Sequence, residues 1–101
     1  MIQLLEHHLD EIVAICKRHG LRKLELFGSA ARGDYNSTLS DIDFFFEFDD
    51  NPVALADRFF GLKEELEQLL GQQVDLVSSQ DVRNPYFLAV ANQHRVTLYA
   101  A

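Results

Sequence analysis

Apolar side chains recur along this chain at two spacings, and the wider spacing predicts three helices. Over residues 2–18 they return every three or four positions on one helical face, and Gly20 suits the end of that helix. The Asn-Pro pairs at 51–52 and 84–85 each place a capping residue before a proline at the first helical position. They predict a second helix that runs to about residue 70 and a third near the end of the chain. The apolar faces of the first two helices comprise Leu5, Leu9, Ile12, Cys16, Leu55, Phe59, Leu62, Leu66 and Leu69. The last helix carries Phe87, Leu88, Val90 and Ala91.

The narrower spacing, in which apolar and polar residues alternate, predicts four strands over residues 22–27, 41–48, 73–77 and 95–99. In the first of them, Lys23 and Glu25 are assigned to the polar face. The second strand has the clearest pattern: its core face holds Ile42, Phe44, Phe46 and Phe48, and its polar face holds Asp41, Asp43, Phe45 and Glu47.

Helical and strand segments interleave, which predicts a mixed α/β (α+β) fold with a small mixed β-sheet packed with helices. The 101 residues suffice for one domain over 1–101, with a polar connector over residues 34–38. The pattern does not fix the order of the strands.

Charge and composition narrow the possible partners. The net charge of -7 argues against a long nucleic acid as a direct partner, because such proteins usually carry a basic stripe. A small nucleotide with a metal ion, or a basic protein, remains compatible with it. No apolar run approaches the ~20 residues needed to span a membrane, and no export signal opens the chain. The single cysteine, Cys16, excludes an internal disulfide and fits the reducing cytoplasm.

The segment from Gly28 to Asp43, GSAARGDYNSTLSDID, contains candidate residues for binding a metal ion and phosphate. Asp41 and Asp43 are two residues apart on a strand, so both carboxylates project from one face, where they repel each other unless a cation intervenes. Paired hard oxygen ligands suit Mg²⁺ that also carries substrate phosphates. Upstream, the turn at Gly28 and Ser29 offers backbone N–H groups to an anion, since glycine permits close approach. The alternative is a solvated strand face and an ordinary capped turn.

GSAARG followed by SDID resembles the signature of minimal nucleotidyltransferases (MNT) of the polymerase-β-like superfamily, and more narrowly the MNT antitoxins that act beside HEPN-domain toxins. The resemblance implies a polymerase-β-like nucleotidyltransferase core. It implies that Gly28 and Ser29 hold the β- and γ-phosphates of a nucleotide and that Arg32 contacts phosphate. Ser40, which precedes the acids, would support the nucleotide site by capping or orienting the start of the strand. Asp75, in the third predicted strand, would be a third acid that completes the metal site and helps to deprotonate the attacking hydroxyl.

The implied reaction is transfer of AMP from ATP, with two Mg²⁺ ions held by Asp41, Asp43 and Asp75. Attack on the α-phosphate would release pyrophosphate, and the acceptor would be a tyrosine hydroxyl of the HEPN toxin, which is thereby silenced. Two alternatives stay open: an antitoxin that only binds and blocks its toxin, and transfer to a small molecule such as an aminoglycoside. Asp75 could also be an outward-facing residue on a half-exposed strand.

Overall fold

The structure, a computed structural model, describes residues 1–36 and 40–101. Residues 37 and 38 of the predicted polar connector therefore lie outside the described residues. No helix of the described part is long and apolar enough to cross a membrane. The elements follow in the order α1 (Gln3–Glu6), α2 (Leu9–Arg18), β1 (Leu21–Phe27), α3 (Ser29–Arg32), β2 (Ile42–Phe48), α4 (Leu55–Leu70), β3 (Val74–Ser78), α5 (Pro85–Ala91), a 3-10 turn (Asn92–His94) and β4 (Val96–Ala100).

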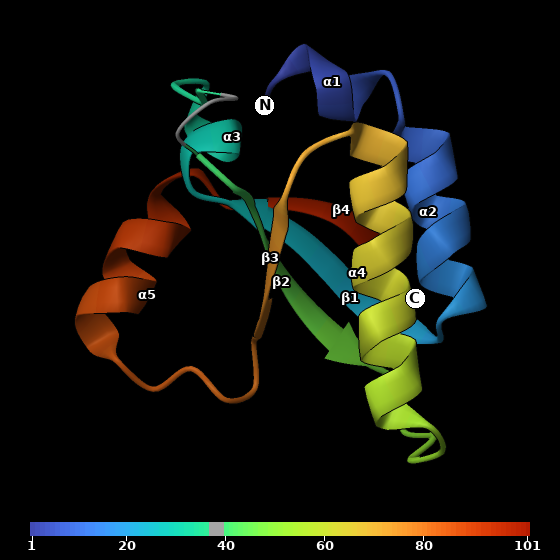
Figure 1. The fold of residues 1–101 in the computed structure, drawn as a ribbon. Coiled ribbons are helices and arrows are strands. Elements are labelled where there is room, and N and C mark those ends of the chain that lie inside the picture. The colour runs from blue at the N-terminus through green and yellow to red at the C-terminus, as the bar shows by residue number, and fades with distance from the viewer. Residues whose placement is uncertain (37–39) are drawn as a thin grey trace.

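The predicted mixed α/β fold is confirmed, with one sheet in the order β3-β2-β1-β4. β1 runs antiparallel to both β2 and β4, whereas β2 and β3 are parallel and are joined by α4. A parallel pair needs such a crossover, because a tight turn can join only antiparallel neighbours. α2 and α4 lie together on one side of the sheet, and α5 lies on the other side (Figure 1).

The main core fills the space between the sheet and the helices α1, α2 and α4. The predicted core face of β2 is confirmed, because Ile42, Phe44 and Phe46 are buried there and Phe48 packs against them. Burial of such side chains contributes roughly 1.5–3 kcal/mol each to the free energy of folding. This packing fixes which face of β2 turns away from the core, and that face carries Asp43.

A second, smaller core lies under α5 and corrects the prediction that the opposite face of β2 is only polar. Phe45 is 1% exposed and stacks on Phe27, with ring centroids 4.1 Å apart. Glu25 is also buried on this face, where Arg95 donates to its Oε1 at 2.5 Å. Alternation along one strand cannot reveal these partners, because they come from other parts of the chain: Phe27 from β1, and Arg95 from just before β4.

Two predicted helix boundaries are wrong for local reasons. The predicted helix 2–18 is broken between α1 and α2: His8 N donates to Leu5 O, and the His8 ring Nδ1 lies 2.8 Å from Leu4 O. The second predicted helix begins at Leu55 and not at residue 52, because Asn51 Oδ1 accepts from Val53 N in a local turn. Ala54, with φ of 55°, separates that turn from α4.

Other boundaries are confirmed. Asn84 caps α5, its Oδ1 accepting from Tyr86 N at 2.9 Å and from Phe87 N at 3.3 Å. Gly20 and Gly71 end α2 and α4 with φ of 67° and 65°, a conformation that glycine adopts without penalty. The third and fourth strands begin and end within one residue of their predicted ranges.

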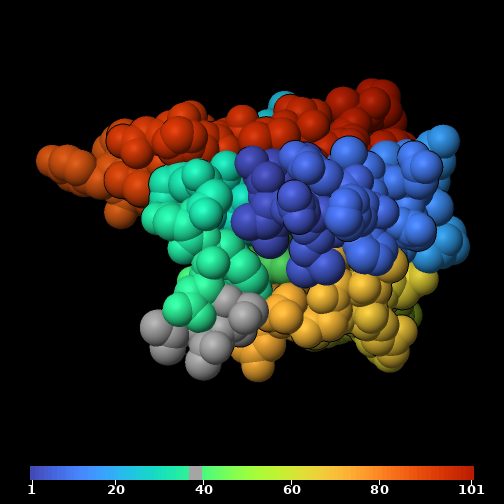
Figure 2. Space-filling view, turned by 90° about the horizontal axis from the view of Figure 1, so that it is seen from above, coloured from blue at the N-terminus to red at the C-terminus, as the bar shows by residue number. Residues whose placement is uncertain are grey.

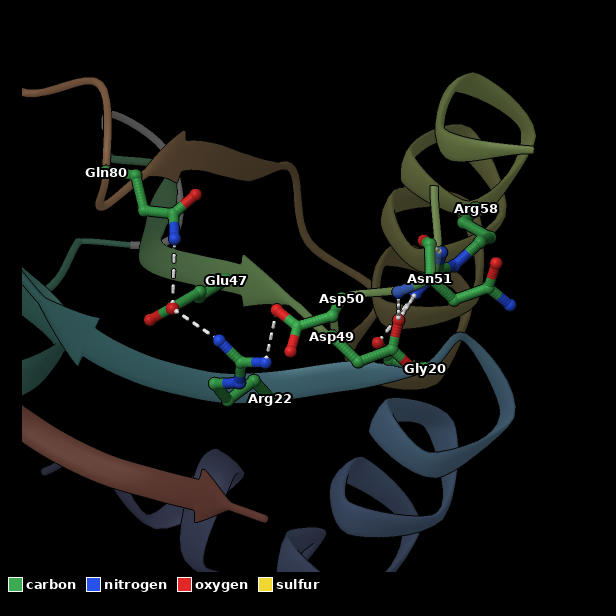
Figure 3. A network of polar contacts seen from close by, with 8 residues as sticks. All are labelled: Gly20, Arg22, Glu47, Asp49, Asp50, Asn51, Arg58 and Gln80. Atoms are coloured by element: carbon green, nitrogen blue, oxygen red, sulfur yellow. Dashed lines mark hydrogen bonds and ion pairs between the residues drawn. The ribbon is translucent and has the colours of Figure 1, made fainter. Parts of the chain in front are cut away.

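A polar network fastens the end of β2 that lies far from the Gly28 turn (Figure 3). Arg58 of α4 donates to Gly20 O at 2.7 Å and to Asp49 Oδ1 at 2.8 Å. Arg22 of β1 contacts Asp50 at 2.7 Å and Glu47 at 3.4 Å. The carboxylates at this end of the strand therefore all have a cationic partner.

Candidate functional site

At the other end of β2, strand register brings two predicted acids together. Asp43 lies directly opposite Asp75 in the parallel pair of β2 and β3, and opposite Phe27 in the antiparallel pair of β1 and β2. Directly opposite residues project from the same face of a sheet, so the two carboxylates are neighbours. Asp41 stands two residues before Asp43, just outside β2, and is exposed, as Asp75 is.

The electrostatics of Asp43 show that this group of acids lacks the neutralisation found at the far end of β2. Burial, and then the charges of Asp75 and Asp41, raise the pKa of Asp43 from 3.8 to about 6, while Arg32 acts in the opposite direction. By contrast, hydrogen bonding to Arg58 lowers the pKa of Asp49. Because like charges disfavour ionisation, Asp43 lies where a cation would be stabilised.

The predicted turn packs directly against this carboxylate. Gly28 has φ of 74°, and a Cβ placed there would lie 2.4 Å from Asp43 Oδ2. Only glycine permits both the backbone angle and the close approach. The structure thus joins the Gly28 turn and Asp43 in one place, although they are fifteen residues apart.

Ser29 and Arg32 are placed by the short helix that follows the turn. Ala31 N and Arg32 N each donate to Gly28 O at 3.1 Å, which holds α3 against the turn. No side chain within the described residues caps α3, so the Ser29 hydroxyl is not used as a cap. Arg32 Nε lies 3.4 Å from Asp34 Oδ1. The positive charge of Arg32 also acts on Asp43, whose pKa it lowers.

The approach to Asp41 involves a residue that the sequence interpretation missed. Ser40 N donates to Asn36 O at 2.8 Å. The Tyr35 hydroxyl donates a hydrogen bond to Gln72 Oε1 at 2.8 Å, two residues before the start of β3. Burial and the charge of Asp41 raise the pKa of Tyr35. Tyr35 belonged to a segment predicted as polar connector, where a single aromatic residue was the only available signal.

Within residues 1–36 and 40–101, no group of three or more His, Cys, Asp or Glu side chains is arranged as a ready metal cage. The donor set nevertheless fits a hard divalent cation, because Mg²⁺ binds through one or two carboxylates and completes its shell with water and substrate phosphate. Asp43 and Asp75 provide two facing carboxylates, and their mutual repulsion is the interaction that a cation relieves. Cys16 is unsuited to ligate a metal ion, since burial raises the pKa of its thiol to about 12.

The site thus consists of a strand-turn-helix whose glycine packs against a strand acid, beside a second acid on the parallel neighbouring strand. The chain belongs to the nucleotidyltransferase domain family, whose model matches residues 9–98, and this confirms the resemblance read from the sequence.

Three proteins illustrate the relationship. The protein adenylyltransferase MntA of Thermococcus cleftensis is 38% identical over 84 residues, which cover 75% of this chain and 82% of that protein. A solved structure assigned as a minimal nucleotidyltransferase matches with a TM-score of 0.75 and 29% identity, covering 93% of this chain and 92% of that one. A chain from the complex of tri-AMPylated Shewanella oneidensis HEPN toxin with MNT antitoxin shares the fold, with a TM-score of 0.63, 18% identity and coverage of 95% and 72%.

Proposed function

We propose that this chain transfers AMP from ATP to a hydroxyl of a protein partner, and that the partner is a HEPN-family toxin which the transfer silences. The observation that carries the proposal is the juxtaposition of Asp43 with Asp75 and with the backbone of Gly28. Nucleotidyl transfer requires acids that bind the metal ion and a turn that binds the phosphates, and the two must lie close together. Paired acids on an ordinary solvated strand face would not require a glycine packed against one of them.

Each site residue has a separate task in this proposal. Asp41, Asp43 and Asp75 would hold Mg²⁺, which when bound neutralises phosphate charge and stabilises the attacking and leaving oxygens of an in-line displacement. The Gly28–Ser29 turn would receive the β- and γ-phosphates through backbone N–H groups and the Ser29 hydroxyl. Arg32 would add a guanidinium on the phosphate side, and Ser40 would keep Asp41 in position.

Transfer itself forms one bond and breaks another. The acceptor oxygen attacks the α-phosphorus, the bond to the bridging oxygen breaks, and pyrophosphate leaves. The acceptor proton passes to a neighbouring base, a role that suits Asp75 because it is exposed and lies beside Asp43. Catalysis by this chain is then mostly positioning and charge stabilisation.

The names of the relatives support a protein acceptor. MntA is a protein adenylyltransferase, and the Shewanella oneidensis HEPN toxin carries AMP in its complex with an MNT antitoxin. We extend the proposal to a tyrosine hydroxyl as the acceptor and to the reducing cytoplasm as the place of action. The buried thiol of Cys16 is compatible with that compartment.

The experiment compares Asp43→Asn with Asp57→Asn, a change of the same chemistry at an exposed position in the first turn of α4. Purified protein is incubated with Mg²⁺, labelled ATP and the protein encoded by the neighbouring gene. We expect Asp43→Asn to lose at least ~100-fold in transfer rate, because a neutral amide cannot replace an anionic ligand. Asp57→Asn should retain the wild-type rate.

Two results would count against the proposal. Near-normal transfer by folded Asp43→Asn would remove Asp43 from the site. Neutralisation of the toxin by Asp43→Asn and wild type alike, with no label transferred by either, would establish an antitoxin that acts by binding alone.

A further inference from the structure

The outer face of α5 is apolar, although water reaches it. The helix, Pro85–Ala91, has the sequence PYFLAVA and contains no charged residue. Tyr86 is 83% exposed, Val90 58% and Phe87 39%. A surface helix ordinarily turns polar side chains to water, and contiguous exposed apolar surface marks a site of interaction. Figure 2 shows the orange part of the chain, which includes α5, extending beyond the rest of the molecule on one side.

The helix is firmly placed, so this exposure does not come from a loose segment. Phe87 packs its ring on Phe27 and Phe45, with centroids 5.7 and 6.0 Å away, and Ala91 is buried. Asn84 caps the helix through two hydrogen bonds. The side that bears Tyr86 and Val90 therefore faces outward in a fixed orientation.

α5 lies one layer of side chains from the candidate site. Phe27, against which Phe87 packs, directly precedes Gly28 and is the cross-strand neighbour of Asp43. α5 and α3 lie on the same side of the molecule in both views (Figure 1, Figure 2). A protein bound to α5 would thus also reach the edge of the nucleotide site.

We propose that the α5 outer face, formed by Tyr86, Val90 and the exposed edge of Phe87, is covered by the acceptor protein itself, through an apolar surface next to its acceptor hydroxyl. The inference rests on the proposed function and adds the surface by which the acceptor is held. Docking there brings the hydroxyl to the α-phosphate in a fixed orientation, and fixed orientation is a large part of the rate in transfer reactions.

Chemistry and size both favour this occupant. Nucleic acid and anionic lipid are gripped through Lys and Arg, and α5 has neither. A second copy of this chain could not be held by α5 alone: a helix of seven residues is about 10 Å long, and a stable interface buries about 800 Å² on each partner. An acceptor protein must contact the site in order to be modified, so its interface continues from α5 onto the site and is not limited to one short helix.

The test uses two substitutions of the same residue type at similar exposure. Val90→Lys places a charge on the α5 outer face. Val53→Lys does the same at Val53, which is 65% exposed in the turn before α4 and belongs to the far end of the sheet. We test wild type and both variants, each as the full chain. Complex formation and transfer of label from ATP are measured with the protein encoded by the neighbouring gene, and ATP binding is measured without it.

We expect Val90→Lys to weaken the complex and raise the KM for the protein acceptor by at least tenfold, with ATP affinity unchanged, while Val53→Lys behaves as wild type. Equal binding and transfer by the two variants would overturn the inference and leave the proposed function intact. Self-association that Val90→Lys abolishes would also overturn it, because the occupant would then be a second copy. If wild type forms a complex that only Val90→Lys weakens, yet transfers no label, the proposed transfer fails and the docking surface stands.

Discussion

Replacing Asp43 with Asn should make the folded protein more stable while it abolishes transfer. In the folded chain the pKa of Asp43 rises from 3.8 to about 6, through burial and the nearby charges of Asp75 and Asp41. The charged form is thus disfavoured by about 3 kcal/mol at pH 7, a figure that water around the half-buried carboxylate reduces to about 1–2 kcal/mol. An amide of the same shape removes that cost.

The pH dependence has a definite sign. Because the pKa of Asp43 is higher in the folded state than its usual value of 3.8, protonation favours the folded state. The cost of the wild-type carboxylate is absent below pH 3.8, grows between pH 3.8 and 6, and is complete above pH 6. The advantage of Asp43→Asn should therefore be largest at pH 7 and should shrink toward pH 4.

Thermal melting measures the effect. A gain of 1–2 kcal/mol corresponds to a melting temperature higher by roughly 5–15 °C for a domain of this size. Asp57→Asn, the matched control, loses a favourable charge at a helix start and should melt at the same temperature or slightly lower. Added Mg²⁺ should raise the melting temperature of wild type and leave Asp43→Asn unchanged. An Asp43→Asn protein that melts at or below wild type at pH 7, or an advantage independent of pH, would refute the reasoning.

Three further substitutions separate the turn, the third acid and the core. Gly28→Ala should lose transfer and about 1–3 kcal/mol of stability, because the new methyl group meets Asp43 Oδ2 and φ is 74°; wild-type rates would remove the turn from the site. Asp75→Asn should lower the pKa of Asp43 toward its usual range, seen by NMR titration, and should eliminate transfer while ATP still binds; an unchanged titration and rate would leave Asp75 as a surface residue. Phe46→Ala should cost about 3–5 kcal/mol in chemical denaturation without altering the site's own chemistry, and an unchanged midpoint would contradict the assignment of the core face.

Local patterns predicted most of the fold, because the physics that decides those elements is local. The alternation that buries Phe44 and Phe46 follows from strand geometry, and the Asn84 cap follows from a side chain that reaches two residues ahead. The same dipeptide failed at Asn51, because that side chain closes a turn on Val53 instead. An Asn before a Pro can either cap a helix, as Asn84 does, or close a local turn, as Asn51 does, and the dipeptide alone does not decide between the two.

Features that depend on distant partners were beyond prediction. Phe45 and Glu25 sit on a face that a single strand marks as polar, and they are buried by partners elsewhere in the chain, among them Phe27, α5 and Arg95. The sequence placed Asp41 and Asp43 near each other, but the position of Asp75 depended on strand order and parallel register. The roles of these acids, and of Gly28 and Arg32, remain predictions until transfer is measured.

The most direct test of the central claim uses ATP labelled at either its α- or its γ-phosphate. Wild type and Asp43→Asn are incubated with the labelled ATP, Mg²⁺ and the protein encoded by the neighbouring gene. The proteins are then separated, and the label attached to each is measured. We predict that wild type transfers the α-label to the partner, that the γ-label leaves as pyrophosphate, and that Asp43→Asn transfers neither. Transfer of the γ-label, or transfer of the α-label at the same rate by Asp43→Asn, would contradict nucleotidyl transfer at this site.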